Sequence, residues 1–313
     1  MSEKSQFCNS PVCPRTRLLV IHNPVAGRRR KRVLRRAIAA LRLAGVEVVE
    51  HVSRCPGDGE VRARAACREP GFDGIVAAGG DGTLNEVVNG CAASGIPVGL
   101  LPMGSANVFA LEAGIPRRPD AWARMVLEGV NRPVRLGRAN GRLFVAMVSA
   151  GFDSRAVATV NLGIKRRIGK LAYALSGCTA LMTAHRDRLT LTIDGRTMDC
   201  GWAIVAKTRH FAGPFRLVPT ASLERDDLGL AVFPVRGWAG RLRDMLLLGM
   251  GWPDRIPGGQ FLAGHKVMLS SPAPILAQMD GDVFMELPIT LECGPAIPFM
   301  LPAPTVVQKP HVK

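Results

Sequence analysis

Apolar positions between residues 18 and 113 recur in two alternating patterns. Short apolar runs predict strands over residues 18–21, 46–52, 74–78 and 98–101. The segments between and after them, about 29–44, 59–68, 84–93 and 107–113, predict helices, and in the first of these one face carries Val33, Ala37, Ile38, Leu41 and Ala44. Strands that alternate with helices indicate a parallel sheet with helices on both faces.

From residue 132 the pattern changes to short alternating segments, and the turn signals Asn140-Gly141 and Asp194-Gly195 favour hairpins. We expect strands over residues 134–138, 143–148, 189–193, 203–207, 229–233, 266–269 and 289–291, with helices near 154–162, 168–184 and 238–248. The prediction is an α/β nucleotide-binding domain over residues 16–131 and a mostly antiparallel β-rich domain over 132–302, with flexible ends at 1–15 and 303–313.

Charge and composition limit the kinds of molecule that this protein is expected to bind. A formal net charge of +16 favours anionic ligands, nucleic acid or an acidic membrane surface, and charge alone does not choose among them. With 5% aromatic residues to stack on bases, we expect no nucleic acid. We find neither a signal peptide nor a membrane-spanning run, which predicts a cytoplasmic protein. The eight cysteines are scattered, and buried thiols are expected rather than disulfides or zinc ligands.

One glycine turn carries most of the chemical information. Residues 79–86 read Gly-Gly-Asp-Gly-Thr-Leu-Asn-Glu and follow the apolar run 75–78 directly. Glycines between a strand and a helix leave backbone N–H groups free to surround a phosphate. The carboxylate of Asp81 would repel a bare phosphate unless a divalent cation or a ribose hydroxyl lay between them. The turn therefore predicts a nucleotide–metal complex.

Further turns follow the other predicted strands of this sheet: residues 23–27 after the first, Ser53 with Pro56-Gly57 after the second, and residues 104–107 after the fourth. Because the carboxyl ends of parallel strands share one sheet edge, we expect these turns to converge on a pocket.

Together these motifs resemble a known family. NPVAG, GGDGTLNEV, PMGSANVFA, SAGFDS and a late DGD, in this order from about residue 17 to 291, are similar to bacterial lipid kinases of the diacylglycerol kinase catalytic-domain superfamily, which also contains sphingosine and ceramide kinases. The resemblance implies an NAD-kinase-like α/β domain followed by a β-sandwich domain, with Asp81 beside the phosphates and Mg²⁺ of bound ATP. It implies ATP-binding residues at Asn23, Pro24, Val25, Ala26, Gly27, Ser53, Gly79, Gly80, Asp81, Gly82, Thr83, Leu84, Asn85, Glu86, Gly104, Ser105 and Asn107.

The same resemblance implies catalytic residues in the second half. Asp282 stands where the family carries Glu, so it is expected to act as the general base that accepts the proton of the lipid hydroxyl, and Asp280 to orient groups. Asp is one methylene shorter than the Glu of the family, so its carboxylate reaches less far toward the substrate. Asp153 corresponds to a position near the lipid head group. Val108 replaces the Asp of many diacylglycerol kinases, which leaves the lipid open between diacylglycerol and sphingoid types.

Some features stay open between a functional and a structural interpretation. Asp226 and Asp227 resemble a loop that holds a structural magnesium, Asp227 being the candidate ligand, but adjacent carboxylates are often only solvated. The basic runs at residues 28–32 and 165–170 are either solvated helix faces or contacts to anionic head groups. The apolar segment 245–252 fits a core helix better than a membrane-interface segment.

The leading hypothesis is an ATP-dependent lipid kinase with a lipid substrate at an anionic membrane surface, peripherally associated with the inner face of the membrane, and with a homodimer among the expected states. An NAD kinase-like enzyme and a non-catalytic nucleotide-binding regulator are the alternatives.

Overall fold

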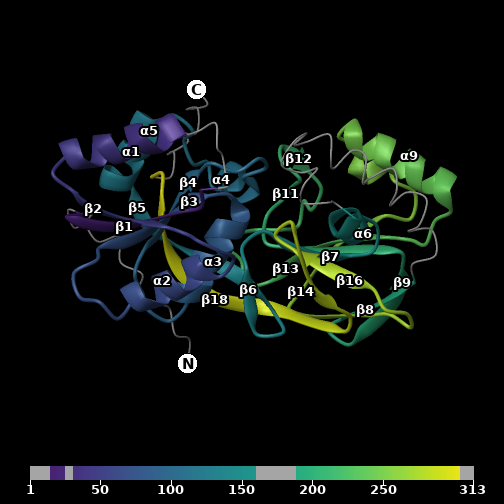
Figure 1. Ribbon diagram of the computed structural model, residues 1–313. Coiled ribbons are helices and arrows are strands. Elements are labelled where there is room, and N and C mark those ends of the chain that lie inside the picture. Colours follow the sequence, from purple (N-terminus) through teal and green to yellow (C-terminus); the bar gives the residue numbers. More distant parts are fainter. Residues whose placement is uncertain (1–14, 25–30, 160–187, 304–313) are drawn as a thin grey trace, which may run out of the picture.

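The computed structural model describes residues 15–24, 31–159 and 188–303. The first half alternates strands and helices as predicted, with β1 (Arg17–His22), α1 (Lys31–Leu43), β2 (Glu47–Val52), α2 (Asp58–Ala66), β3 (Gly74–Gly79), α3 (Asp81–Cys91), β4 (Val98–Pro102), α4 (Val108–Glu112) and α5 (Pro119–Glu128). The strands pair in parallel in the order β2-β1-β3-β4. Helices α1 and α5 cover one face of this sheet and α2 and α3 the other (Figure 1).

The second half is antiparallel, as predicted. It contains β5 (Val130–Ala139), β6 (Arg142–Phe144), β7 (Met147–Ala150), α6 (Phe152–Thr159), β8 (Leu189–Ile193), β9 (Arg196–Cys200), β10 (Trp202–Ala206), β11 (His210–Phe211), β12 (Phe215–Arg216), β13 (Leu228–Phe233), α9 (Trp238–Gly249), the 3-10 helix η3 (Pro253–Arg255), β14 (Gln260–Gly264), β15 (Lys266–Ser270), β16 (Leu276–Met279), β17 (Asp282–Glu286) and β18 (Ile289–Leu301). A six-stranded sheet, β14-β13-β10-β7-β16-β17, packs against β18, β15 and β8. The predicted fold class is confirmed.

Strand β18 joins the two halves. It pairs antiparallel with β15 and β5, and Phe299 near its end pairs in parallel with Val98 of β4. A bulge between Cys293 and Ala296 interrupts its register with β5 and bends the strand from one half toward the other. We predicted only residues 289–291 of it, because Pro295 and Pro298 interrupt the apolar pattern. The last strand of the chain therefore completes the sheet that the first strands begin.

Three tight hairpins shape the second half. Asn140-Gly141, Asp194-Gly195 and Asp280-Gly281 all have positive φ at both central residues, as a type I′ turn requires. The first two were predicted. The third connects β16 to β17 with Met279 paired to Asp282, so Asp282 is the first residue after the turn.

Other predictions need correction. The expected strand 143–148 is divided between β6 and β7, while α5, β9, β14, β16 and β17 were not predicted. On α1 the buried face contains Leu34 rather than Ala44, which lies beyond the helix end. The predicted helix 168–184 and the basic run 165–170 lie outside the described residues. No helix in the described part of the chain is long and apolar enough to cross a membrane.

Candidate active site

Two glycine turns meet at the carboxyl edge of the parallel sheet. Strand β3 is buried throughout and ends at Gly79, and α3 begins at Asp81 with no side chain capping its first turn. The N–H groups of Met103 and Gly104, which follow β4, donate to the Gly79 carbonyl at 2.7 and 3.1 Å. A Cβ on Gly104 would lie 2.6 Å from the Cα of Gly80, so glycine is required for this backbone contact. The turn leaves the N-terminus of α3 available to an anion.

Asp81, in the turn after β3, forms hydrogen bonds that hold the turn after β4 in place. Its carboxylate accepts hydrogen bonds from the N–H groups of Val108 and Phe109, both at 3.0 Å, at the N-terminus of α4. Burial raises the pKa of Asp81, and these backbone hydrogen bonds act in the opposite direction. The side chain expected beside the phosphates is therefore also a positioning residue for the 103–107 turn.

Two polar atoms at the same sheet edge have no hydrogen-bond partner among the described residues. Ser53 follows β2, its N–H donates to the His22 carbonyl at 2.9 Å, and its buried Oγ is unpaired. Asn107, in the left-handed conformation and 2% exposed, donates from Nδ2 to the Gly104 carbonyl, while its Oδ1 is unpaired. Unpaired buried polar atoms cost free energy that a polar ligand would recover.

Of the other residues predicted to bind ATP, some lie at the same sheet edge and some lie outside the described part of the chain. Asn23 and Pro24 lie at this edge, where the Asn23 N–H donates to the Ala78 carbonyl, and Ser105 is exposed. Residues 25–27 lie outside the described part of the chain.

The side chains of α3 beyond Gly82 are occupied by the protein itself. Thr83 and Leu84 are buried, and Leu84 belongs to the core of the parallel sheet. The Glu86 carboxylate accepts from the N–H groups of Gly57 and Gly59, both at 3.0 Å, at the start of α2. Glu86, which was predicted to bind ATP, thus fixes the turn that follows Ser53.

Asp280 ties the second half to α3. Its carboxylate accepts from the N–H groups of Val145, Ala146 and Met147 at 2.8–3.0 Å and from Asn85 Nδ2 at 2.8 Å. Burial raises the pKa of Asp280 to about 6, against the pull of these four donors. Asn85 was predicted to bind ATP, but its Nδ2 donates to Asp280 and to the Leu143 carbonyl.

This contact brings Asp282 to the glycine turn. A Cβ on Gly82, in the first turn of α3, would lie 3.1 Å from Oδ2 of Asp282. Asp282 is exposed, whereas Asp280 two residues earlier is enclosed by its donors. A carboxylate from the second half therefore stands directly beside the uncapped helix N-terminus of the first, an arrangement suited to a bound anion and a proton acceptor.

Comparison with known proteins matches both halves of the chain. Residues 17–139 match the diacylglycerol kinase catalytic domain, and residues 146–300 match the YegS C-terminal NAD kinase beta sandwich-like domain. A Bacillus subtilis protein named diacylglycerol kinase is 36% identical over 66% of this chain and 70% of its own length. The chain belongs to the diacylglycerol kinase catalytic-domain family of bacterial lipid kinases.

Two further relatives extend the comparison. A Pseudomonas aeruginosa protein named "Probable lipid kinase YegS-like" is 34% identical over 69% of the kinase and 72% of its own length. A crystal structure of a Bacillus anthracis diacylglycerol kinase has the same fold, with a TM-score of 0.73, 20% identity and coverage of 94% of the kinase and 99% of that chain. The predicted family and the prediction of a lipid kinase are confirmed.

Asp153 lies inside the kinase rather than at an open surface. It is 8% exposed, and its carboxylate accepts from Ser149 Oγ, from Trp202 Nε1 at 2.8 Å and from Gln278 Nε2 at 3.3 Å. Burial raises its pKa, and the hydrogen bonds lower it. The role expected for it, a contact to the lipid head group, would require these partners to be displaced.

Gln278, which sequence reasoning missed, links this network to the site. Its Oε1 accepts from the Gly281 N–H at 2.8 Å, in the turn just before Asp282. The available signal was a polar residue in an otherwise apolar strand, directly before the Asp-Gly-Asp motif.

Two basic side chains contact the Asp227 loop of the kinase. Lys207, fully buried, donates from Nζ to the carbonyls of Arg225 at 2.6 Å and Asp227 at 2.9 Å. Arg225 contacts the Asp227 carboxylate itself. A divalent cation at these carbonyls would have to displace one positive charge and face another. The other carboxylate oxygen of Asp227, Oδ1, is buried without a hydrogen-bond partner among the described residues, so Asp227 as a metal ligand stays a prediction.

Proposed function

We propose that this lipid kinase transfers the γ-phosphate of MgATP to the hydroxyl of a diacylglycerol- or sphingoid-type lipid at the cytosolic surface of the membrane. The observation that carries the proposal is the 3.1 Å between Oδ2 of Asp282 and the Cβ position of Gly82. Transfer to an alcohol needs a phosphate cradle and a proton acceptor within reach of each other, and these two residues bring them together.

Each part of the site has a distinct task in this reaction. The uncapped N-terminus of α3 binds the phosphates through backbone N–H groups, and the unpaired Ser53 Oγ and Asn107 Oδ1 are available to polar groups of the nucleotide. Magnesium, which enters with ATP, supplies neutralisation of the charge that develops on the phosphates. Asp282 accepts the hydroxyl proton as the lipid oxygen attacks the γ-phosphorus. Asp280 accepts a hydrogen bond from Asn85 of α3 and so holds the β16–β17 turn beside that helix.

A transfer assay tests the proposal directly. The protein is incubated with γ-labelled ATP, Mg²⁺ and either vesicles of extracted lipid or NAD, and products are identified by mass spectrometry. We expect label in lipid, and its loss in Asp81→Asn, because Val108 and Phe109 donate to different carboxylate oxygens and the amide replaces one of these with an NH2 donor. Label in the dinucleotide alone would identify an NAD kinase. ATP binding without transfer to any acceptor would identify a regulator.

A further inference from the structure

Helix α9 packs Met245, Leu247 and Leu248 partly against the core, yet it also buries charged residues and exposes large apolar ones. Its buried positions include Arg241 and Asp244, each 1% exposed. Its solvent side carries Trp238, Leu242 and Leu246, continued by Met250 just beyond its end, with exposures of 65%, 41%, 60% and 53%. These four residues, the α9 stripe, follow at intervals of four and so form one continuous band along the helix. A surface helix normally turns its apolar band inward, so an outward band indicates a partner.

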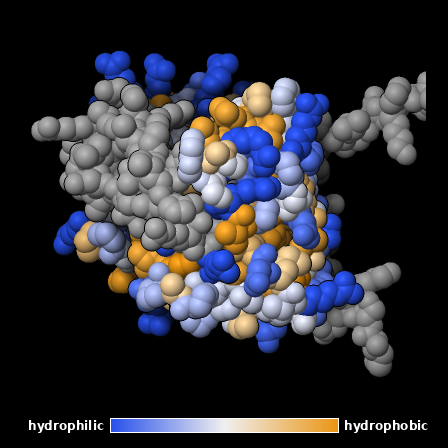
Figure 2. All heavy atoms as spheres, turned by 90° about the vertical axis from the view of Figure 1, so that its right-hand side faces the viewer, coloured by the Kyte–Doolittle hydropathy of each residue, from blue (hydrophilic) through white to orange (hydrophobic). Residues whose placement is uncertain are grey.

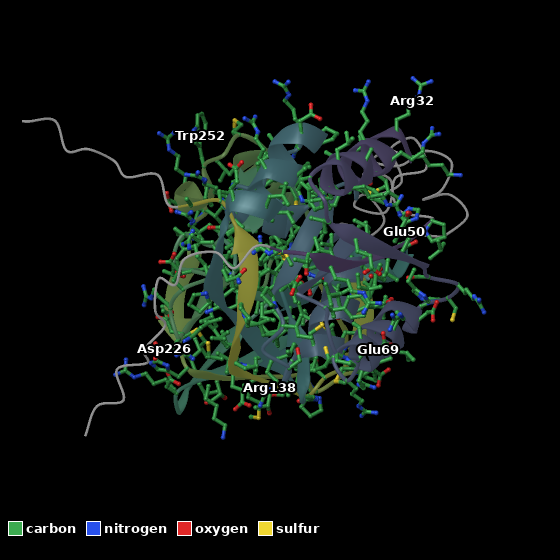
Figure 3. All side chains as sticks on the ribbon, turned by 90° about the vertical axis from the view of Figure 1, so that its left-hand side faces the viewer. Arg32, Glu50, Glu69, Arg138, Asp226 and Trp252 are labelled. Carbon is green, nitrogen blue, oxygen red and sulfur yellow. The ribbon has the colours of Figure 1, made fainter. Side chains whose placement is uncertain are left out.

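The surroundings of the α9 stripe indicate an anionic lipid surface as that partner. Trp252, labelled at the outer edge of the molecule in Figure 3, is 44% exposed, and the Arg255 guanidinium lies 4.5 Å from its ring centroid. Tryptophans, here at both ends of the stripe, with flanking arginines are typical of segments that lie at a membrane interface.

The local charges agree with this choice. Arg236 and Arg243 both contact the buried Asp244, and Arg255 lies beyond the stripe, with Asp254 as the nearby exposed carboxylate. Together with the buried Arg241, these are four arginines around two aspartates, which leaves a positive balance on a chain whose net charge is +16. Figure 2, which looks at the end of the molecule where α9 lies in Figure 1, shows hydrophobic residues at the surface between hydrophilic ones.

Helix α9 is linked to the strand of the proposed catalytic carboxylate through α6. Arg241 of α9 lies 5.9 Å from the ring centroid of Phe152, the first residue of α6. Helix α6 in turn packs against β17, the strand that begins with Asp282. A membrane bound to the stripe would therefore be separated from the base by two helices, α9 and α6.

We propose that the α9 stripe docks this kinase on anionic lipid bilayers, with Trp238, Leu246 and Trp252 entering the interface and Arg243 and Arg255 contacting head groups. The inference rests on the proposed function for the identity of the acceptor, but the docking itself can be measured without turnover.

Vesicle binding is the first test. The full chain is sedimented with vesicles of phosphatidylcholine alone or with about one third phosphatidylglycerol. We expect binding to the mixed vesicles, about ten-fold weaker in Trp238→Ser and in Leu246→Ser. Leu43→Ser is the matched control, since Leu43 is 89% exposed on α1. Equal binding of all variants, or no binding at all, would overturn the proposal.

Tryptophan fluorescence of the unmodified protein gives a second readout. Trp122 and Trp202 are 1% exposed, so a blue shift on adding mixed vesicles arises from Trp238 and Trp252. Brominated lipids should quench this emission. Unchanged emission in the presence of bound protein would show that another surface binds the membrane and would contradict the proposal.

Activity separates this inference from the proposed function. Stripe variants should phosphorylate short-chain diacylglycerol or sphingosine, below the aggregation threshold, at the wild-type rate and lose about ten-fold on the same lipid in vesicles. No phosphorylation in either format would refute the function while leaving the vesicle result to judge the docking. A homodimer that Leu246→Ser dissociates would assign the stripe to a second copy and overturn the membrane role.

Discussion

At the scale of residues, the polar side chains of the site divide into those that brace it and those that lack a partner. Both carboxylate oxygens of Asp81 and of Glu86 accept backbone hydrogen bonds. Ser53 Oγ and Asn107 Oδ1 have no partner among the described residues. Bracing residues should affect stability first, whereas the unpaired atoms should affect ligand affinity first.

Ser53→Ala tests this division. Because the buried hydroxyl has no partner in the described structure, its removal should leave the free energy of unfolding unchanged or raise it by up to about 1 kcal/mol. The Kd for ATP should rise about three- to ten-fold as one hydrogen bond is lost. Ser94→Ala is the contrast, since Ser94 Oγ donates to the Cys91 carbonyl at 2.9 Å, and it should lower stability without changing the Kd. Calorimetry and urea unfolding measure both quantities.

The sequence identified the motifs of this site better than the directions of their side chains. Glycines after an apolar run predict a turn, and the turn is present at Gly79 and Gly80. Once α3 begins at Asp81, however, helical geometry directs Leu84 into the core and Glu86 to α2. The bonds that Gln278 makes with Asp153 and Gly281 depend on contacts between strands, which no local pattern encodes.

At the scale of elements, α4 is held at both ends. Asp81 accepts from its first N–H groups, and Glu112 at its last residue accepts from Arg209 N and Nε at 2.9 and 2.7 Å and from His210 Nδ1 at 2.7 Å. Burial acts to raise the pKa of Glu112, but the hydrogen bonds from His210 and Arg209 outweigh it and hold the pKa below its usual value. The 103–107 turn is therefore fixed to the second half.

The pH dependence of stability in Glu112→Gln tests the depressed pKa of Glu112. A carboxyl whose folded pKa is depressed contributes stability above its ordinary pKa of 4.5, and the contribution is lost as pH falls through the lower folded value. We expect the variant to be about 2 kcal/mol less stable at pH 7, with the difference narrowing below pH 4.5. Glu128→Gln, at an exposed position of α5, serves as control. A difference that is constant with pH would contradict this account.

The Lys207 ammonium gives the 225–227 loop a fixed cation. Lys207→Met should lower the Tm by about 4–8 °C, because the carbonyls of Arg225 and Asp227 lose their buried donor. Lys266→Met, on the exposed face of β15, should have little effect. EDTA or excess Mg²⁺ without nucleotide should leave the wild-type Tm unchanged. A Tm that rises with Mg²⁺ alone would instead indicate a structural metal site.

Helices and strands were predicted correctly where the segment has a regular hydrophobic pattern. They were missed where a strand forms only because it pairs with neighbouring strands. The strands of the parallel sheet are continuous apolar runs and were predicted within a few residues. Strands β9, β14 and β17 carry exposed residues and exist because neighbouring strands hydrogen-bond to them. Tertiary pairing of this kind has no signal in a single segment.

At the scale of the whole molecule, the two halves are joined by strand β18 and by the hydrogen bonds of Asp280. Strand β18 runs from the sandwich into the parallel sheet, and Asp280 connects the β16–β17 turn with α3 and with residues 145–147 (Figure 1). Arg241 of α9 lies 5.9 Å from the Phe152 ring of α6, and α6 packs on β17, so the proposed membrane-docking stripe belongs to the same half as the base. The proposed lipid-docking stripe and the proposed base thus lie in one half, while the phosphate-binding turn at Gly82 lies in the other.

The most direct test of the account compares Asp282→Asn with wild type in a single experiment that measures both kcat for lipid phosphorylation and the Kd for ATP. The account predicts that kcat falls at least about 100-fold, because the proton acceptor beside Gly82 is lost, while the Kd changes less than about two-fold. Asp282→Glu should retain activity, and Glu286→Gln, exposed on the same strand, should behave as wild type. A wild-type kcat in Asp282→Asn would contradict the central claim that this carboxylate receives the proton.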